Sequence, residues 1–175
     1  MTKYQKIIEI MNKMNSSMSF PRLLATITDS ATELLSAEGA SLLLVDKKTD
    51  ELIFDVVVSD KGEIIRGKRI KIGVGIAGHV AKSGQSVVVN DVLNDPRFYS
   101  DIDMASGFTT RSIIASPVQL HDNLIGVIEA VNAKGNGGFT EEDMAMLRYL
   151  GDAAALSIQT HELVMNLQNR VNELT

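Results

Sequence analysis

The side chains best suited to chemistry gather in the middle of the sequence, between positions 79 and 112. Asp91, Asp95 and Arg97 can anchor a ligand, or can hold a loop by bonding to nearby backbone amides. Arg111 can bind a carboxylate or phosphate through two parallel hydrogen bonds, although an internal salt bridge to the acids of the loop is the favoured interpretation. The pattern predicts either a polar ligand site or a braced loop, and both alternatives stay open.

The chain has three histidines, and none of them has a partner at metal-ligand spacing. His79 can ligate haem iron or bond to a ligand, but a solvent-facing or packing role is the favoured interpretation. His121 and His161 are predicted to be exposed. No cysteine is present, and no serine lies in a nucleophile elbow. We therefore expect no catalytic residue, no metal site and no enzymatic activity, and the sequence leaves any cofactor undefined.

A glycine-marked segment, residues 71–91, is predicted to position these side chains. Gly73 and Gly75 permit a turn, and a short helix with one apolar face follows. Gly84 is a typical helix end, and residues 86–89 are β-branched and strand-like. A short helix between two strands, with glycines at both ends, is a suitable wall for a small-molecule cavity.

Hydrophobic periodicity predicts the elements around this segment. Helices are expected over residues 3–15, 20 to about 37, and 140 onward. Strands are expected over residues 40–46, 51–58, within 63–72, 111–120 and 124–132, with Gly126 marking a close backbone approach. Residues 91–110 are predicted to form a long irregular loop, which in a compact domain often serves as a lid. The first helix is expected to bury one face formed by Tyr4, Ile7, Ile8, Met11 and Met14.

This order of elements predicts an α+β domain with a central antiparallel sheet. The N- and C-terminal helices should cover one face of the sheet. The short helix and the long loop should cover the other face, where a ligand would lie.

Composition narrows the class of protein. The 175 residues are 45% hydrophobic, which predicts one domain with a packed core. The net charge is −5 and Lys and Arg form no dense cluster, which argues against nucleic acid as a partner. No apolar run approaches the length of a membrane span, so no membrane insertion is expected. The absence of cysteine fits a reducing, cytoplasmic setting.

Several segments together carry a family resemblance. The glycine-marked segment is similar in its glycines, apolar positions and terminal acid to the GAF domains, which are sensory modules of signalling proteins. Further matches occur in family order at residues 91–98 (DVLNDPRF), 110–118 (TRSIIASPV), 124–128 (LIGVI) and 139–147 (FTEEDMAML). The resemblance covers about residues 20–160.

The resemblance implies a small-molecule ligand in a cavity between the sheet and residues 75–110, in a GAF/PAS-like fold. Candidate ligand-binding residues are Val45, Phe54, Ile76, His79, Asp91, Val92, Phe98, Phe108, Arg111 and Ser112. The ligand itself stays open among a cyclic nucleotide, an oxo-acid, haem or none. Family members that reduce free methionine sulfoxide, or that hold a bilin, use cysteines, which are missing here.

The motif that the family links to cyclic-nucleotide binding is resembled by Asn132, Lys134, Phe139 and Asp143. In the family a Lys–Asp bridge ties the last strand to the long helix, so a bridge from Lys134 to Asp143 is a candidate here. Ala133 separates Asn from Lys and Met144 replaces an acid, so this motif gives cyclic-nucleotide binding no support.

The end of the chain has heptad spacing from position 150 to 174, with apolar residues at Val164, Leu167, Val171 and Leu174. The helix either packs on residues 4–14 or joins a second copy, and we favour a homodimer because an uncovered seam exposes apolar area. The expected organisation is an N-terminal helix (1–19), a sensory domain (20–160) and a helical signalling extension (161–175). The rival function is a dimerisation module that binds no ligand.

Overall fold

The computed structural model describes residues 1–16, 18–60 and 62–175 of the chain. A six-stranded antiparallel sheet has the strand order β3-β2-β1-β6-β5-β4. Its strands are β1 (Ala37–Asp46), β2 (Glu51–Val58), β3 (Arg69–Lys71), β4 (Val87–Val89), β5 (Ile113–Leu120) and β6 (Asn123–Ala133). The helices are α1 (Lys3–Met14), α2 (Phe20–Leu34), α3 (Gly62–Ile65), α4 (Gly75–Ser83), η1 (Val92–Asn94), α5 (Asp101–Ser106) and α6 (Glu141–Leu174).

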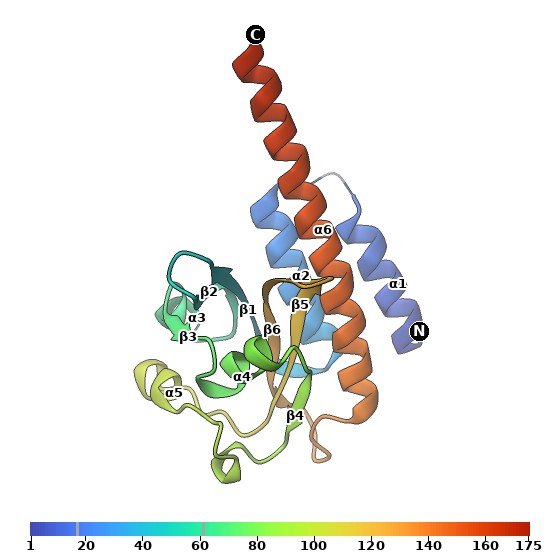
Figure 1. Ribbon diagram of the computed structural model, residues 1–175. Coiled ribbons are helices and arrows are strands. Elements are labelled where there is room, and N and C mark those ends of the chain that lie inside the picture. Colours follow the sequence, from blue (N-terminus) through green and yellow to red (C-terminus); the bar gives the residue numbers. More distant parts are fainter. Residues whose placement is uncertain (17, 61) are drawn as a thin grey trace.

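The two faces of the sheet are covered by different helices. The long helices α1, α2 and α6 lie together on one face, while α3, α4, α5 and their loops lie on the other (Figure 1). Neighbouring residues of a strand point to opposite faces, so Leu42 joins the core under the long helices and Leu43 joins the core under α4. The predicted α+β class and its two layers are confirmed.

The centre of the sheet is held by the pairing of β1 with β6 and β2. The strands predicted at 40–46 and 51–58 are present as the antiparallel neighbours β1 and β2. A Cβ on Gly126 of β6 would overlap the carbonyl oxygen of Leu43 in β1, which confirms the predicted close backbone approach. The predicted short helix is also confirmed as α4, and it ends at Gly84 with a left-handed φ of 68°.

Some boundaries and short elements differ from the sequence prediction. Helix α2 ends at Leu34 rather than near Ala37, because Ser36 takes a left-handed φ of 49° and Ala37 already begins β1. Residues 91–110 are not wholly irregular, since they contain η1 and α5. Helix α3 was also not predicted. These helices span six residues at most, too few to show a helical period.

The buried face of α1 is narrower than predicted. Ile7, Ile10 and Met14 are buried, whereas Tyr4, Ile8 and Met11 are exposed. Apolar residues occupy two sides of this helix, but only the stripe at spacings of three and four residues can face α2 and α6. The remaining apolar side of α1 lies at the surface.

The start of α6 is tied to the N-terminal helix rather than to the last strand. Lys3 Nζ lies 2.6 Å from Asp143 Oδ1, so Asp143 pairs with Lys3 and not with the expected Lys134. Burial acts to raise the pKa of Asp143, but hydrogen bonds from Lys3 and Thr140 lower it overall. Thr140 and Asp143 also form a capping box, which is worth about 1 kcal/mol in typical helices.

The far end of α6 projects beyond the sheet (Figure 1). His161 on this helix was predicted to be exposed, but it is partly covered, because its ring lies 5.1 Å from that of Phe20. Beyond it Val164, Leu167 and Val171 are about half exposed, with exposed fractions of 47–60%. Among the described residues, no helix has the length and hydropathy needed to cross a membrane.

Candidate functional site

A cavity lies between the sheet and the layer formed by α4 and α5. Its volume is about 80 Å³. Its floor comes from β1, β2, β5 and β6, one wall from the first turn of α4, and its cover from residues 98–110, which include α5. Most of the lining is apolar, and the aromatic contributions are Phe54, Phe98, Tyr99 and Phe108.

Two carboxyl groups face this cavity from opposite sides. Glu129 comes from the central strand β6, where it pairs across the sheet with Ser41 of β1, and it is only 7% exposed. Asp103 comes from the covering helix α5. Burial, together with the nearby charge of Asp103, raises the pKa of Glu129 to about 7. The cavity therefore holds an acid that changes charge near neutral pH.

Asp103 also links α5 to the end of the cover at Thr110. Its two carboxylate oxygens accept hydrogen bonds from the backbone N–H and the hydroxyl of Thr110, both at 2.7 Å. Ser106 accepts a bond from the N–H of Phe108 at 3.1 Å. These bonds fold α5 back over residues 107–110, so that the segment closes the cavity as a short lid.

A second hollow, which we call the outer groove, lies on the outer side of this lid. It is larger, about 530 Å³, and more open. Exposed Leu93 and Met104 line it together with Asp91 and Arg111. We take the inner cavity as the candidate site despite its smaller volume, because it is more enclosed and contains the buried carboxyl of Glu129.

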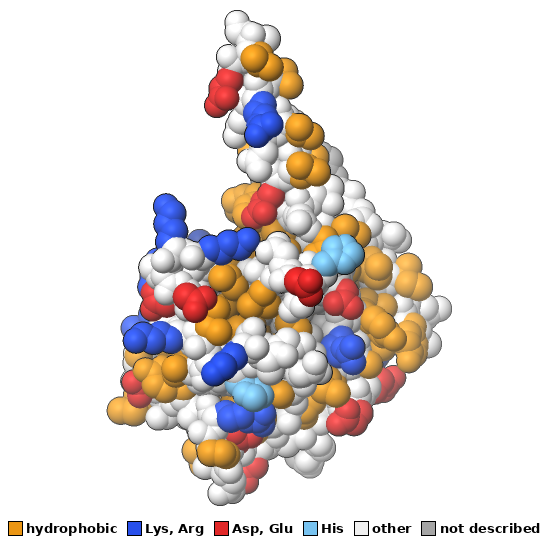
Figure 2. Space-filling view, viewed as in Figure 1, with side chains coloured by type: hydrophobic (Ala, Val, Ile, Leu, Met, Phe, Trp, Pro, Cys, Tyr) orange, Lys and Arg blue, Asp and Glu red, His pale blue; other side chains and the backbone are white. Residues whose placement is uncertain are grey.

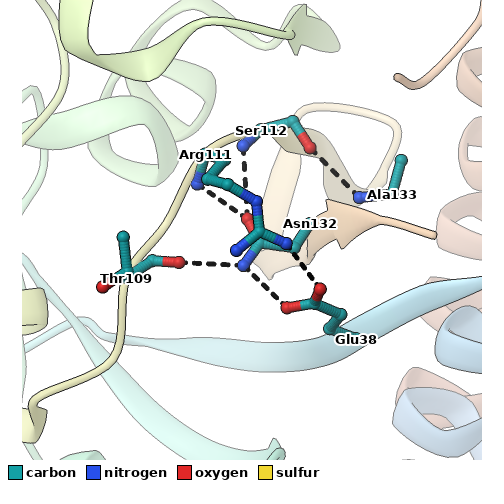
Figure 3. Close-up of polar contacts among 6 residues, drawn as sticks. All are labelled: Glu38, Thr109, Arg111, Ser112, Asn132 and Ala133. Atoms are coloured by element: carbon teal, nitrogen blue, oxygen red, sulfur yellow. Dashed lines mark hydrogen bonds and ion pairs between the residues drawn. The ribbon is translucent and has the colours of Figure 1, made fainter. Parts of the chain in front are cut away.

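A polar network at the end of β6 fixes the point where the lid joins β5 (Figure 3). The side-chain oxygen of Asn132 accepts bonds from the N–H groups of Arg111 and Ser112, and its amide donates to Glu38 and to the carbonyl of Thr109. Asn132 is 1% exposed and has a left-handed φ of 57°. An asparagine tolerates this backbone better than most residues. Asn132, which resembles a residue of the family motif, thus has a structural role here, because it braces the lid.

Arg111 forms an internal salt bridge, but not with the acids of the loop that were expected to hold it. Its guanidinium pairs with Glu38 of β1. The hydrogen bond from Asn132 is the largest cause of the lowered pKa of Glu38. Burial opposes it, and the hydrogen bond from Arg111 adds to the lowering. The loop acids have other partners, since Asp95 holds Arg97 at 2.9 and 2.7 Å and Asp91 accepts from Asn94 at 2.6 Å.

The pair of Asp95 and Arg97 braces the loop before the lid. The hydrogen bonds from Arg97 lower the pKa of Asp95 to about 2, with a further contribution from His79 on α4. Nearby, Asn90 exchanges two hydrogen bonds with the backbone of Phe139, at 2.8 and 2.9 Å. The segment that leads into the lid is therefore connected directly to Phe139, two residues before the start of α6.

The sequence-predicted site residues fall into five groups. Phe54, Ile76, Phe98 and Phe108 line the inner cavity. Asp91 and Arg111 line the outer groove, while Val45 and Val92 pack in the core on the cavity side. His79 is half-buried on α4. Ser112 is buried, and its hydroxyl accepts a bond from the N–H of Ala133 at 3.1 Å.

Sequence reasoning missed the polar half of the cavity. The overlooked lining residues are Ser41, Asp103, Ser106, Thr110 and Glu129. Glu129 had a visible signal, because it is the one acid in the apolar run 124–131 of a strand predicted to be central. Among the described residues, no group of three or more His, Asp or Glu side chains has an arrangement that could hold a metal ion.

Comparison with known proteins agrees with this architecture. The family model described as "GAF domain" matches residues 19–158. A probable 3',5'-cyclic phosphodiesterase, pde-5 of Caenorhabditis elegans, is 33% identical over 135 residues, which are 72% of this chain and 18% of the relative. The chain thus spans less than a fifth of the length of that curated relative.

Solved structures show the same fold at lower identity. The GAF domain of a phosphoenolpyruvate-protein phosphotransferase from Coxiella burnetii has a TM-score of 0.83 at 19% identity, covering 94% of this chain and 96% of that one. A free methionine-R-sulfoxide reductase from Neisseria meningitidis, solved with its substrate, has a TM-score of 0.77 at 21% identity, covering 93% and 91%.

Proposed function

This chain belongs to the GAF domain family, and from that premise we propose that it is the sensory, non-catalytic part of a cytoplasmic signalling protein. A small molecule binds in the inner cavity beneath α5, and its binding changes the positions of the terminal helices. GAF domains are a regulatory family, and this chain has no cysteine to serve in a thiol-based reduction.

The observation that carries the proposal is the enclosed cavity with buried polar groups on two sides. Glu129 and Ser41 lie on the floor, Asp103 and Thr110 on the lid, and most of the remaining lining is apolar. Such a combination of apolar walls with a few convergent polar groups is typical of ligand sites. At about 80 Å³ the cavity is smaller than a nucleotide requires, so the lid must open to admit a metabolite.

A path for the signal leads from the lid to α6. The loop before the lid contacts the residues that lead into α6, through the bonds of Asn90 to Phe139. The start of α6 in turn holds α1 through Asp143 and Lys3. A ligand that binds the open and closed lids unequally would bias both terminal helices through these contacts.

We expect a ligand of the cavity to raise the melting temperature of the chain. The relationship to a probable cyclic phosphodiesterase makes cyclic AMP and cyclic GMP the first ligands to test, followed by 2-oxoglutarate and haem. A ligand at 100 times its Kd adds about 2.7 kcal/mol of stability, which corresponds to a rise of roughly 5–10 °C. Differential scanning fluorimetry measures this shift.

Two variants show where such a ligand binds. Ser41→Leu fills the inner cavity and should weaken binding at least tenfold, a loss of about 1.4 kcal/mol. Leu93→Ser alters only the outer groove and should leave binding unchanged. The proposal fails if no compound in the panel raises the melting temperature, and the inner site fails if Leu93→Ser weakens binding while Ser41→Leu does not.

The exposed seam of α6 favours a second function, dimerisation. Val164 and Val171 occupy one heptad position and Leu167 and Leu174 the other, a pattern that favours parallel two-stranded coiled coils. Apolar residues stand out along the projecting end of α6 (Figure 2). A chain that forms dimers and binds no ligand would be the dimerisation module. A chain that forms dimers and also binds a ligand would be a sensor with a helical output.

We predict that Leu167→Glu weakens self-association at least tenfold, because it places a charge in the seam. Asn169→Glu adds the same charge on the opposite side of the helix and should leave self-association unchanged. Analytical ultracentrifugation of both variants, and of the chain cut after Thr160, measures this. A full chain that sediments as a monomer at all concentrations would end the dimer proposal, and retained ligand binding in the cut chain would favour the sensor over the rival.

A further inference from the structure

In the part of the chain that the structure describes, the two carboxyls of the inner cavity have no positively charged partner. Among the described residues that line the cavity there is no lysine, arginine or histidine, and the ionisable ones are Glu129, Asp103 and Tyr99. Asp103 is satisfied by Thr110, and the hydroxyl of Tyr99 donates to Asp101 at 2.7 Å. Glu129 has no hydrogen bond or ion pair with another described residue, although it is more than nine-tenths buried.

A buried, unpartnered carboxylate beside a second one is costly. Removing a carboxylate from water without a partner disfavours its charged form, and a like charge nearby adds to that effect. The neighbours of Glu129 within the sheet, Ser41 and Ala115, carry no charge that could offset it. One positive charge or one proton between the floor and the lid therefore neutralises this unfavourable pair of carboxylates in the closed cavity.

Resting on the proposed function, we propose that Glu129 and Asp103 select the ligand by charge. The closed cavity accepts either a proton on Glu129 or an N–H donor group of the ligand, best a cation such as an ammonium, amidinium or guanidinium. When a cation binds to protonated Glu129, the proton leaves to solvent and an ion pair takes its place. A ligand group that is itself a carboxylate is excluded from this end of the cavity.

The position of α5 makes this selection part of lid closure. Asp103 is carried by the lid and Glu129 by the central strand, so their repulsion acts only when the lid is closed. A bound cation removes that repulsion and favours the closed lid. The cavity thus contains both Glu129, which recognises the ligand, and α5, whose position depends on whether a cation is bound.

The test follows the carboxyl carbon of Glu129 by NMR in the full chain labelled with carbon-13 at glutamate, with Glu129→Gln identifying the signal. We expect a titration midpoint near 7. Guanidinium chloride at 20 mM should lower this midpoint by at least one pH unit, and sodium acetate at 20 mM should not. Asp103→Asn should also lower it. Asp101→Asn removes a charge from the same helix outside the cavity and should leave it unchanged.

The inference is overturned if Glu129 titrates near 4.5 like an ordinary glutamate, or if guanidinium and acetate act alike. Neither result depends on identifying a metabolite. If the screen of nucleotides and oxo-acids fails but the NMR results are as expected, only the proposed ligands are contradicted. If a metabolite binds but Glu129 titrates like an ordinary glutamate, only the charge selection is contradicted.

Discussion

Glu129→Gln is expected to make the protein more stable at pH 8, by about 3 kcal/mol in the free energy of unfolding. The pKa of Glu129 rises from 4.5 to about 7 on folding, and each pKa unit is worth about 1.4 kcal/mol. At pH 8 the folded chain must keep this carboxylate charged and buried. Glutamine keeps the shape without the charge, and its amide can donate toward Asp103, so the penalty disappears.

The sign of the pH dependence follows from proton binding. Because the folded pKa lies above the unfolded one, the folded state binds more protons between pH 4.5 and 7. The contribution of Glu129 to stability is therefore best below pH 4.5, falls as the pH rises toward 7, and stays low above that. Other acids, such as Asp95 with its pKa of about 2, change stability in the opposite direction and at lower pH.

Urea unfolding at pH 5 and pH 8 measures this effect. The native chain should lose stability between the two pH values relative to Glu129→Gln, in which this part of the pH dependence is absent. Glu173→Gln makes the same chemical change at an exposed position near the end of α6 and should alter stability by less than about 0.5 kcal/mol. Equal stabilities of the native chain and Glu129→Gln at pH 8 would show that Glu129 is solvated in the folded state.

The parts of the fold that sequence predicts well are those that local pattern determines. The neighbouring strands β1 and β2, helix α4 with its end at Gly84, and the start of the last helix near residue 140 all depend on residues within a few positions of one another. Period and turn chemistry report on such neighbours directly. The layer arrangement then follows, because each amphipathic element has one face that it must bury.

The parts that failed depend on contacts between distant positions. Asp143 is paired with Lys3, 140 residues away, and Arg111 with Glu38, 73 residues away. From the sequence alone, several lysines and arginines are possible partners for Asp143. Only the packing of α1 beside α6 selects Lys3. The burial of Ile10 in place of Tyr4 on α1 has the same origin.

The candidate site was predicted in its apolar half. Phe54, Ile76, Phe98 and Phe108 lie where large apolar side chains near a glycine-marked helix are expected to converge, and the cavity includes them. On the floor, Ser41 and Glu129 were missed because polar site residues were sought in and next to the irregular segment, where Asp91 and Arg111 lie on the outer side of the lid. An acid in the middle of a central, apolar strand is the stronger signal, because its burial is costly unless a ligand or proton compensates it.

Gly126→Ala is expected to cost about 4 kcal/mol of stability, more than most single substitutions. The added Cβ would overlap the carbonyl of Leu43, which is backbone in the centre of the sheet and has no rotamer by which to move away. Relief requires β6 to separate from β1 at the pairing of Gly126 with Leu44, and this strain lies in the strand that carries Glu129. Ligand binding should therefore weaken along with stability.

A second glycine provides the matched control for that substitution. Gly137 has open space around the position of a Cβ and no left-handed φ, so Gly137→Ala should change stability by less than about 0.5 kcal/mol. Urea unfolding of both variants, with the slope against urea checked to be unchanged, separates a local clash from a general effect of alanine. If Gly126→Ala is as stable as Gly137→Ala, β1 and β6 lie farther apart than described, and the floor of the cavity with Ser41 and Glu129 would have to be redrawn.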